Sequence, residues 1–169
     1  MDPSQTDSQR KRPLRSWQPF LFGKKDPMNA QDPNQEVQTI LIISGDAEMV
    51  SLWETYFEQK KYRVISETTA EEGLQTARLH APALILCALD LPDDEQLSVC
   101  RELRAATDGT LLLFAGEKTK PDINKYALAG VDEYIPASVN PMALLIKCMA
   151  WLARQDWVVP RRQIMQALA

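Results

Sequence analysis

The chain has 169 residues, of which 45% are hydrophobic and 25% are charged. This length and composition are typical of one globular domain with a hydrophobic core, plus tails. No stretch approaches the roughly 20 apolar residues of a membrane span, and the N-terminus lacks the apolar segment of a secretory signal. The formal net charge of −4 argues against a folded body that binds nucleic acid broadly. We therefore expect a cytoplasmic protein.

The first 36 residues differ in composition from the rest of the chain. They hold five of the eleven prolines and no sustained hydrophobic period, which predicts an arm that is disordered or ordered by a partner. The arm carries six basic and five acidic residues, which leaves 19 − 6 = 13 basic against 23 − 5 = 18 acidic residues in the body.

Within the arm, residues 10–25 form a basic run that contains no acid and is interrupted by aromatic residues. The residues that would bind a partner are Arg10, Lys11, Arg12, Arg15, Trp17, Phe20, Phe22, Lys24 and Lys25. Such a run suits an acidic protein groove, a lipid headgroup surface or nucleic acid. A disordered leader of chance composition is the alternative.

Strand and helix signals alternate from Gln38 onward. Short, continuous apolar runs are typical of strands that are buried on both faces of a sheet. Such runs predict five strands, at residues 39–43, 62–66, 83–89, 111–114 and 133–135. Helical spacing and capping signals predict five helices. The first follows Asp46, and the second starts at Thr69, with Glu72 in a capping box. The others cover 97–104 with an end near Gly109, 121–128 with Gly130 as the end, and Asn140 to about Ala153.

Five strands that alternate with five helices predict an α/β fold, a single doubly wound parallel sheet with helices on both faces. In such a sheet a functional site forms at the carboxyl ends of the strands. We expect an arm over residues 1–36, this domain over 37–155 and a C-terminal extension over 156–169. In the extension Ile164, Met165 and Leu168 share one side of a short helix, which either packs back onto the domain or docks onto a partner.

Few residues are suited to catalysis or metal binding. Cys87, Cys100 and Cys148 lie in apolar runs without CxxC spacing, so we expect reduced, buried thiols. The single histidine, His80, cannot build a metal site alone and is expected at a helix end. No glycine-rich phosphate loop and no plausible Ser–His–Asp triad occurs. The sequence therefore predicts neither an enzyme nor a bound cofactor or metal.

Residues 39–154 resemble the receiver domain of bacterial response regulators. The resemblance is carried by the strand at 40–43, the segment from Pro82 to Leu103 with Leu91-Pro92-Asp93 inside it, the turn Ala129-Gly-Val-Asp-Glu-Tyr134, and Asn140-Pro-Met-Ala-Leu-Leu145. It implies a CheY-like fold of five βα units and a place in two-component phosphorelay signalling.

The resemblance also implies a phosphorylation site, but the residues that such a site needs are missing. Two acids after the first strand and an acceptor aspartate after the third would hold Mg²⁺. A Thr or Ser after the fourth strand and a lysine after the fifth would bind the phosphoryl group and offset its charge. These positions fall on Ser44, Gly45, Ala88, Ala115 and Ala137.

Two further positions in the last strand region bear on the resemblance. Ser138 stands where a proline usually follows the lysine, so the cis peptide bond of the family is not expected. Tyr134 stands where the family has its switch aromatic, and an ordinary half-buried strand tyrosine is the alternative.

Our first hypothesis is a phosphorylation-independent pseudo-receiver, a protein-interaction module in bacterial signalling or complex assembly with the arm as its docking segment. A second face, which would meet a partner or a second copy, comprises Lys120, Asn124, Lys125, Tyr134 and residues 140–151.

Three alternatives stay open. One is a response regulator with non-standard activation, for instance at Asp90, two residues beyond Ala88. Another is a domain that binds a small molecule at the strand ends, which an apolar lining of Leu89, Leu91, Ala115 and Ala137 disfavours. The last is a protein tethered to nucleic acid or membrane by its arm.

Overall fold

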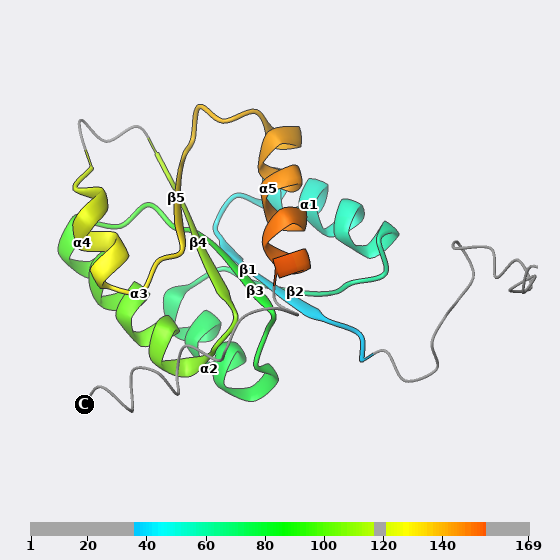
Figure 1. Cartoon of the computed structure of the whole chain (residues 1–169), viewed down its shortest axis with the longest axis horizontal. Coiled ribbons are helices and arrows are strands. Elements are labelled where there is room, and N and C mark those ends of the chain that lie inside the picture. The colour runs from blue at the N-terminus through cyan, green and yellow to red at the C-terminus, as the bar shows by residue number, and fades with distance from the viewer. Residues whose placement is uncertain (1–35, 117–120, 155–169) are drawn as a thin grey trace, which may run out of the picture. The chain divides into compact units, whose positions relative to one another are not determined.

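The structure, a computed structural model, describes residues 36–116 and 121–154. Five strands form one sheet: β1 (Thr39–Ser44), β2 (Arg63–Glu67), β3 (Leu84–Ala88), β4 (Thr110–Ala115) and β5 (Glu133–Pro136). All neighbouring strands are parallel, and their order is β2-β1-β3-β4-β5 (Figure 1). The predicted doubly wound α/β fold is therefore confirmed.

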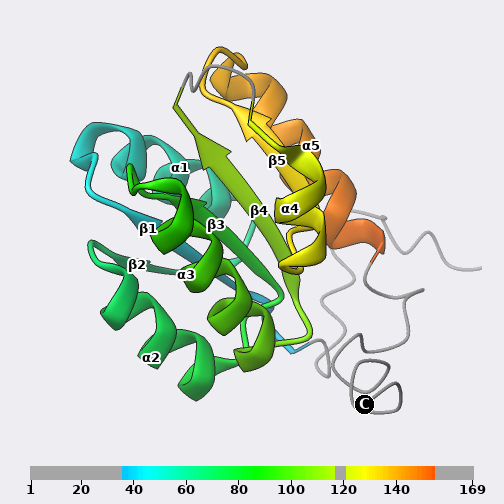
Figure 2. The same cartoon turned by 90° about the vertical axis from the view of Figure 1, so that its left-hand side faces the viewer.

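Each strand is followed by a helix, as right-handed parallel connections require. The helices are α1 (Ala47–Gln59), α2 (Ala70–His80), α3 (Asp93–Ala106), α4 (Ile123–Leu128) and α5 (Pro141–Arg154). Two of them, α1 and α5, cover one face of the sheet, and α2, α3 and α4 cover the other (Figure 2). Because both faces are covered, Ile40, Leu41, Ile42 and Ile43 are all fully buried on β1, which lies between β2 and β3. This burial explains why the strand reads as a continuous apolar run.

Two helix starts follow the predicted capping chemistry. Asp46 lies before α1, and its Oδ1 accepts hydrogen bonds from the backbone N–H groups of Glu48 and Met49, both at 3.1 Å. The hydroxyl of Thr69 accepts from the backbone N–H of Glu72 at 3.3 Å and donates to the Glu72 carboxylate at 2.9 Å. This reciprocal bonding lowers the pKa of Glu72 and confirms the capping box.

The ends of α3 differ from the prediction. The helix begins at Asp93, four residues earlier than its apolar spacing indicates, because its first turn is acidic and exposed. It ends at Ala106, and Thr107 after it is extended with φ −149°. Gly109 is thus not the helix cap that we predicted. Its position instead excludes a side chain, since a Cβ there would lie 2.1 Å from the carbonyl oxygen of Pro82.

The short helix α4 also starts later than predicted. Asp122 caps it, so the helix begins two residues after Pro121. Gly130 follows its end with φ +98°, in the left-handed region that favours glycine, as its place after the helix predicts.

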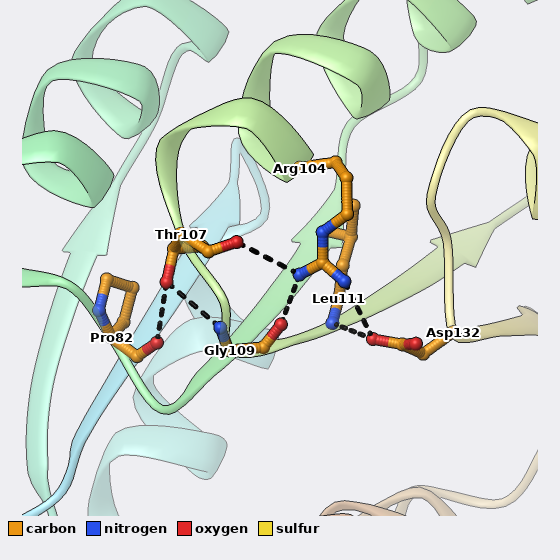
Figure 3. Close-up of polar contacts among 6 residues, drawn as sticks. All are labelled: Pro82, Arg104, Thr107, Gly109, Leu111 and Asp132. Carbon is orange, nitrogen blue, oxygen red and sulfur yellow. Dashed lines mark hydrogen bonds and ion pairs between the residues drawn. The ribbon is translucent and has the colours of Figure 1, made fainter. Parts of the chain in front are cut away.

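A buried polar network ties the amino ends of β4 and β5 to α3. Arg104 and Asp132 form an ion pair, with 3.4 Å between Nη1 and Oδ2, and their side chains are only 5% and 2% exposed. The same Asp132 oxygen accepts the backbone N–H of Leu111 at 2.8 Å. Figure 3 shows the guanidinium reaching from α3 between the chain segments that it joins.

The remaining bonds of this network fix the connection between α3 and β4. The other Arg104 nitrogen donates to the carbonyl oxygens of Thr107, at 3.3 Å, and Gly109. The Thr107 hydroxyl donates to the carbonyl oxygen of Pro82 at 3.2 Å and accepts from the Gly109 N–H at 3.1 Å (Figure 3). Carbonyl acceptors and the Asp132 carboxylate, with the charge of Asp108 nearby, thus compensate a charge that could not otherwise be buried.

Candidate functional site

The sheet brings the five positions of the resemblance to one edge, at the carboxyl ends of the strands. Ser44 ends β1 and pairs directly with Ala88, the last residue of β3. Ala115 ends β4, and its carbonyl oxygen accepts the backbone N–H of Ala137, just beyond β5, at 2.9 Å. Gly45 follows Ser44 at the same edge. The structure therefore places these positions at the edge where a site is expected in this fold class.

The groups at this edge offer little chemistry. Ser44 is only 2% exposed, and its hydroxyl oxygen accepts the backbone N–H of Asp46 at 3.1 Å, so it serves the turn into α1. Ala88 is half-buried, Ala115 is buried and Ala137 is exposed. The three alanine side chains can neither ligate a cation, nor accept a phosphoryl group, nor offset its charge.

Gly45 leaves open space at the edge. A Cβ built on it meets nothing within 4 Å, and the residue is exposed with no left-handed φ. The backbone therefore admits a side chain at one of the two positions where the resemblance implies an acid.

Several acids surround the edge without converging on one point. Asp46 caps α1, Asp90 is exposed between β3 and α3, and Asp93, Asp94 and Glu95 form the first turn of α3. Negative charge in the first turn of a helix complements its dipole. Within residues 36–116 and 121–154, no group of three or more His, Cys, Asp or Glu side chains could hold a metal ion.

A tyrosine that the sequence analysis did not single out connects this edge to α4. The Tyr126 hydroxyl donates to Asp93 Oδ1 at 3.1 Å, although the side chain is only 4% exposed. Burial, and then the hydrogen bond and charge of Asp93, raise the pKa of Tyr126 above its ordinary value. Because 33 residues separate the partners, no local pattern could have indicated the contact.

Tyr126 also stacks on the predicted switch aromatic. The rings of Tyr126 and Tyr134 have centroids 5.4 Å apart and are tilted by 45°. Tyr134 is half-buried on β5 and packs on the core cluster that includes Ala115. The structure thus places Tyr134 as a half-buried strand tyrosine, which both interpretations of this residue allow. Every peptide bond in the described ranges is trans, including the one before Ser138.

The second predicted surface, α4–β5–α5, carries a polar cluster around Glu133. Its carboxylate accepts from Lys147 Nζ and, at 2.7 Å, from Trp151 Nε1, while the Arg154 guanidinium lies 5.2 Å from the centre of the Trp151 indole. Burial opposes ionisation of Glu133, but the hydrogen bonds and the Lys147 charge outweigh it and lower the pKa. Asn124 and Lys125 are exposed on α4, and Lys120 lies outside the described residues.

The remaining predicted residues are placed as follows. All three cysteines are free and buried, as predicted, and burial raises the pKa to about 11 for Cys87 and about 12 for Cys100 and Cys148. His80 is the last, exposed residue of α2, at a helix end as predicted. The binding residues of the arm, Arg10 to Lys25, and the C-terminal extension lie outside the described residues.

No helix of the described part has the length and apolar character that crossing a membrane requires.

Comparison with known proteins agrees with this fold and edge. The family model of the response regulator receiver domain matches residues 40–148. The transcriptional regulatory protein RstA of Escherichia coli K12 is 28% identical over 123 residues, which are 71% of this chain and 50% of RstA. The probable transcriptional regulator ycf27 of Porphyridium aerugineum is 28% identical over 119 residues, 70% of this chain and 50% of ycf27. The chain thus spans about half the length of the curated relatives that it matches.

Solved structures show the same architecture. A CheY-like receiver domain protein of Methanospirillum hungatei JF-1 superposes with a TM-score of 0.64 at 26% identity, over 72% of this chain and 98% of that one. The N-terminal receiver domain of Klebsiella pneumoniae RstA superposes with a TM-score of 0.57 at 23% identity, over 68% and 98% of the two chains, a likeness of fold. Because the family match covers more than half of the chain, this protein belongs to the response regulator receiver domain family of two-component signalling.

Proposed function

We propose that this chain is a pseudo-receiver, which works by binding protein partners and not by accepting a phosphoryl group. The observation that carries the proposal is the composition of the sheet edge, where Ser44, Gly45, Ala88, Ala115 and Ala137 meet. Phosphoryl transfer depends on groups that position and offset developing charge. An edge with one engaged hydroxyl and three methyl groups supplies none of them.

The surroundings of the edge support the same conclusion. Asp46 and Asp93, the acids best placed to substitute, are both engaged, one in the α1 cap and one with Tyr126. Asp90 is exposed, and among the described residues no cationic side chain forms an ion pair with it. The domain acts in the cytoplasm as a binding module and not as an enzyme, and it needs neither metal nor cofactor.

Two surfaces are available for partners under this proposal. The basic arm, residues 10–25, docks onto an acidic protein surface, with its cations steering the encounter and its aromatic rings supplying buried area. The α4–β5–α5 surface meets a second partner or a second copy. The contacts of Tyr126 with Asp93 and Tyr134 support a fixed arrangement of this surface, because they hold α4 against both the edge and β5.

A phosphodonor experiment tests the proposal directly. The full chain is incubated with acetyl phosphate and Mg²⁺, and its intact mass is measured beside a receiver that retains its acceptor aspartate. We expect the control to gain about 80 Da, the mass of one phosphoryl group, and this chain to gain nothing. A stoichiometric adduct on this chain refutes the proposal, and mapping that adduct to Asp90 establishes non-standard activation instead.

A restored site provides the matched variant. Substituting S44D, G45D, A88D and A137K places two acids, an acceptor and a lysine where the resemblance implies them. Only Ser44 among these positions is fully buried, and Gly45 has open space, so the scaffold admits most of the change. We expect labelling of the restored chain under conditions in which the parent chain stays unmodified.

The arm is tested by a binding comparison. Chains with and without residues 1–36 are used as bait in pull-downs, and recovered proteins are identified by mass spectrometry. We expect partner recovery to fall when the arm is removed, and equal recovery contradicts its role. Binding to DNA or anionic liposomes that weakens with salt and depends on the arm favours a tether to nucleic acid or membrane.

A further inference from the structure

Helix α5 is apolar on the side that it turns away from the sheet. Its inner side buries Leu144, Leu145, Cys148 and Leu152 in the core. Its outer side carries Met142, 56% exposed, and Ile146, 64% exposed, followed by the exposed Ala150 and Ala153. At 100° per residue these four positions point in one direction. We call them the α5 stripe.

No charged residue interrupts the α5 stripe. The charged residues of α5 are Lys147 and Arg154, and both lie toward the β5 flank, in contact with Glu133 and Trp151 respectively. The exposed sides of α2 and α3, in contrast, carry polar residues such as Glu71, Gln75 and Arg101. A single exposed apolar side chain is ordinary, but several that line up on the outer side of a helix are typical of a surface that is covered.

The chain continues directly from the end of the α5 stripe. Residues 155–159 follow Arg154, and five residues are enough for the loop of an antiparallel helix pair. Pro160 then suits the first position of a helix. In the sequence that follows, Ile164, Met165 and Leu168 share one side with Arg161, which lies at the start of the segment, while Arg162, Gln163 and Gln166 lie on the other.

We propose that residues 161–169 pack as a helix antiparallel to α5 and cover the α5 stripe from Ile146 to Ala153. At 1.5 Å per residue, the nine residues extend about 13.5 Å, and this part of the stripe extends about 10.5 Å. Positions equally far from the middle of the loop then face each other, so that Ile164 meets Ala150 and Leu168 meets Ile146. The small Ala150 and Ala153 allow the two helices a close approach near the loop.

Engineered cysteines test this pairing in the full chain. The double variant A150C/I164C is oxidised under mild conditions, and the native cysteines do not interfere because all three are buried. We expect an intramolecular disulfide, seen as a monomer that has lost two hydrogens in intact mass. The matched control is L79C/I164C, because Leu79 is 79% exposed on α2, which covers the opposite face of the sheet.

Any result other than an intramolecular disulfide that forms preferentially in A150C/I164C overturns the proposal. A disulfide between two chains in A150C/I164C means that a second copy covers the α5 stripe. Equal intramolecular cross-linking in both variants means that the segment has no preferred site. Absence of cross-linking in A150C/I164C means that the segment does not lie on α5.

A labelling rate gives a second, independent readout. Two chains, A150C and A150C/I164E/L168E, are each treated with a water-soluble maleimide. The substitutions I164E and L168E place charges on the apolar side of the segment. We expect labelling to become about tenfold faster, which corresponds to a covered state populated at roughly 90%. The control pair Q163E/Q166E adds the same charge on the polar side and leaves the rate unchanged. Equal rates in all three chains overturn the proposal.

Discussion

The buried ion pair between Arg104 and Asp132 predicts a large loss of stability when one partner is removed. In Asp132→Ala the guanidinium stays buried, 5% exposed, and keeps the Thr107 and Gly109 carbonyl oxygens and the nearby charge of Asp108 as compensation. Breaking a buried pair by removing one partner typically costs 3–5 kcal/mol. The Leu111 N–H loses its acceptor as well, which costs about 1–3 kcal/mol when it is considered alone.

These two costs share one carboxylate and do not add fully. We therefore expect Asp132→Ala to lower the free energy of unfolding by about 4 kcal/mol, a large part of the 5–15 kcal/mol that is typical of a domain. Urea unfolding followed by circular dichroism measures the change. The control Asp90→Ala removes an exposed aspartate and should stay within about 0.5 kcal/mol of the parent.

A double variant separates the unpaired charge from the lost contacts. If the buried charge dominates the cost, then R104M/D132A is more stable than the sum of the two single losses predicts, because it buries no ion. A loss below 1 kcal/mol in Asp132→Ala, or strict additivity in the double variant, would refute this account of the network.

Three smaller effects are expected in the same unfolding assay. Gly130→Ala should cost about 1–3 kcal/mol, because the residue has φ +98° and a Cβ would lie 2.4 Å from Arg104 Cγ; a neutral result contradicts the required left-handed backbone. Tyr126→Phe should cost about 1 kcal/mol through the lost bond to Asp93, and hydrogen exchange should rise in α4 but not in α2. Glu133→Gln should cost about 0.5 kcal/mol at pH 7, since Lys147 is 42% exposed and screened. Because the folded-state pKa of Glu133 is lowered, this difference should shrink as the pH falls below 4.5, and a difference that grows there contradicts the assignment.

The sequence was most informative where local patterns and burial coincide. The apolar run 39–43 predicts β1 to within one residue, because a strand covered on both faces must be apolar throughout. Asp46 and Thr69 mark helix starts, because a cap bonds to backbone groups two or three residues away. The same locality explains why the resemblance could place the strand-end residues correctly at one edge.

Contacts between distant segments could not be predicted in this way. The end of α3 is set by Thr107, whose hydroxyl bonds to Pro82, 25 residues earlier. Arg104 was predicted only as a helix residue, whereas its burial depends on Asp132, 28 residues later. Asp93 and Tyr126 likewise meet only once the sheet has formed. Apolar spacing also fails in the first turn of α3, where acids complement the helix dipole before the buried stripe begins.

The open space beside Gly45 has a consequence for how the domain can evolve. Since a Cβ there meets nothing within 4 Å, the backbone admits a carboxylate at this position without repacking of the core. A glycine codon and an alanine codon each lie one nucleotide change from a codon for aspartate or glutamate. The proposed loss of phosphoryl chemistry is thus a change of side chains and not of the backbone. A gene copy released from its binding role could regain an acid at position 45 or 88 by a single step.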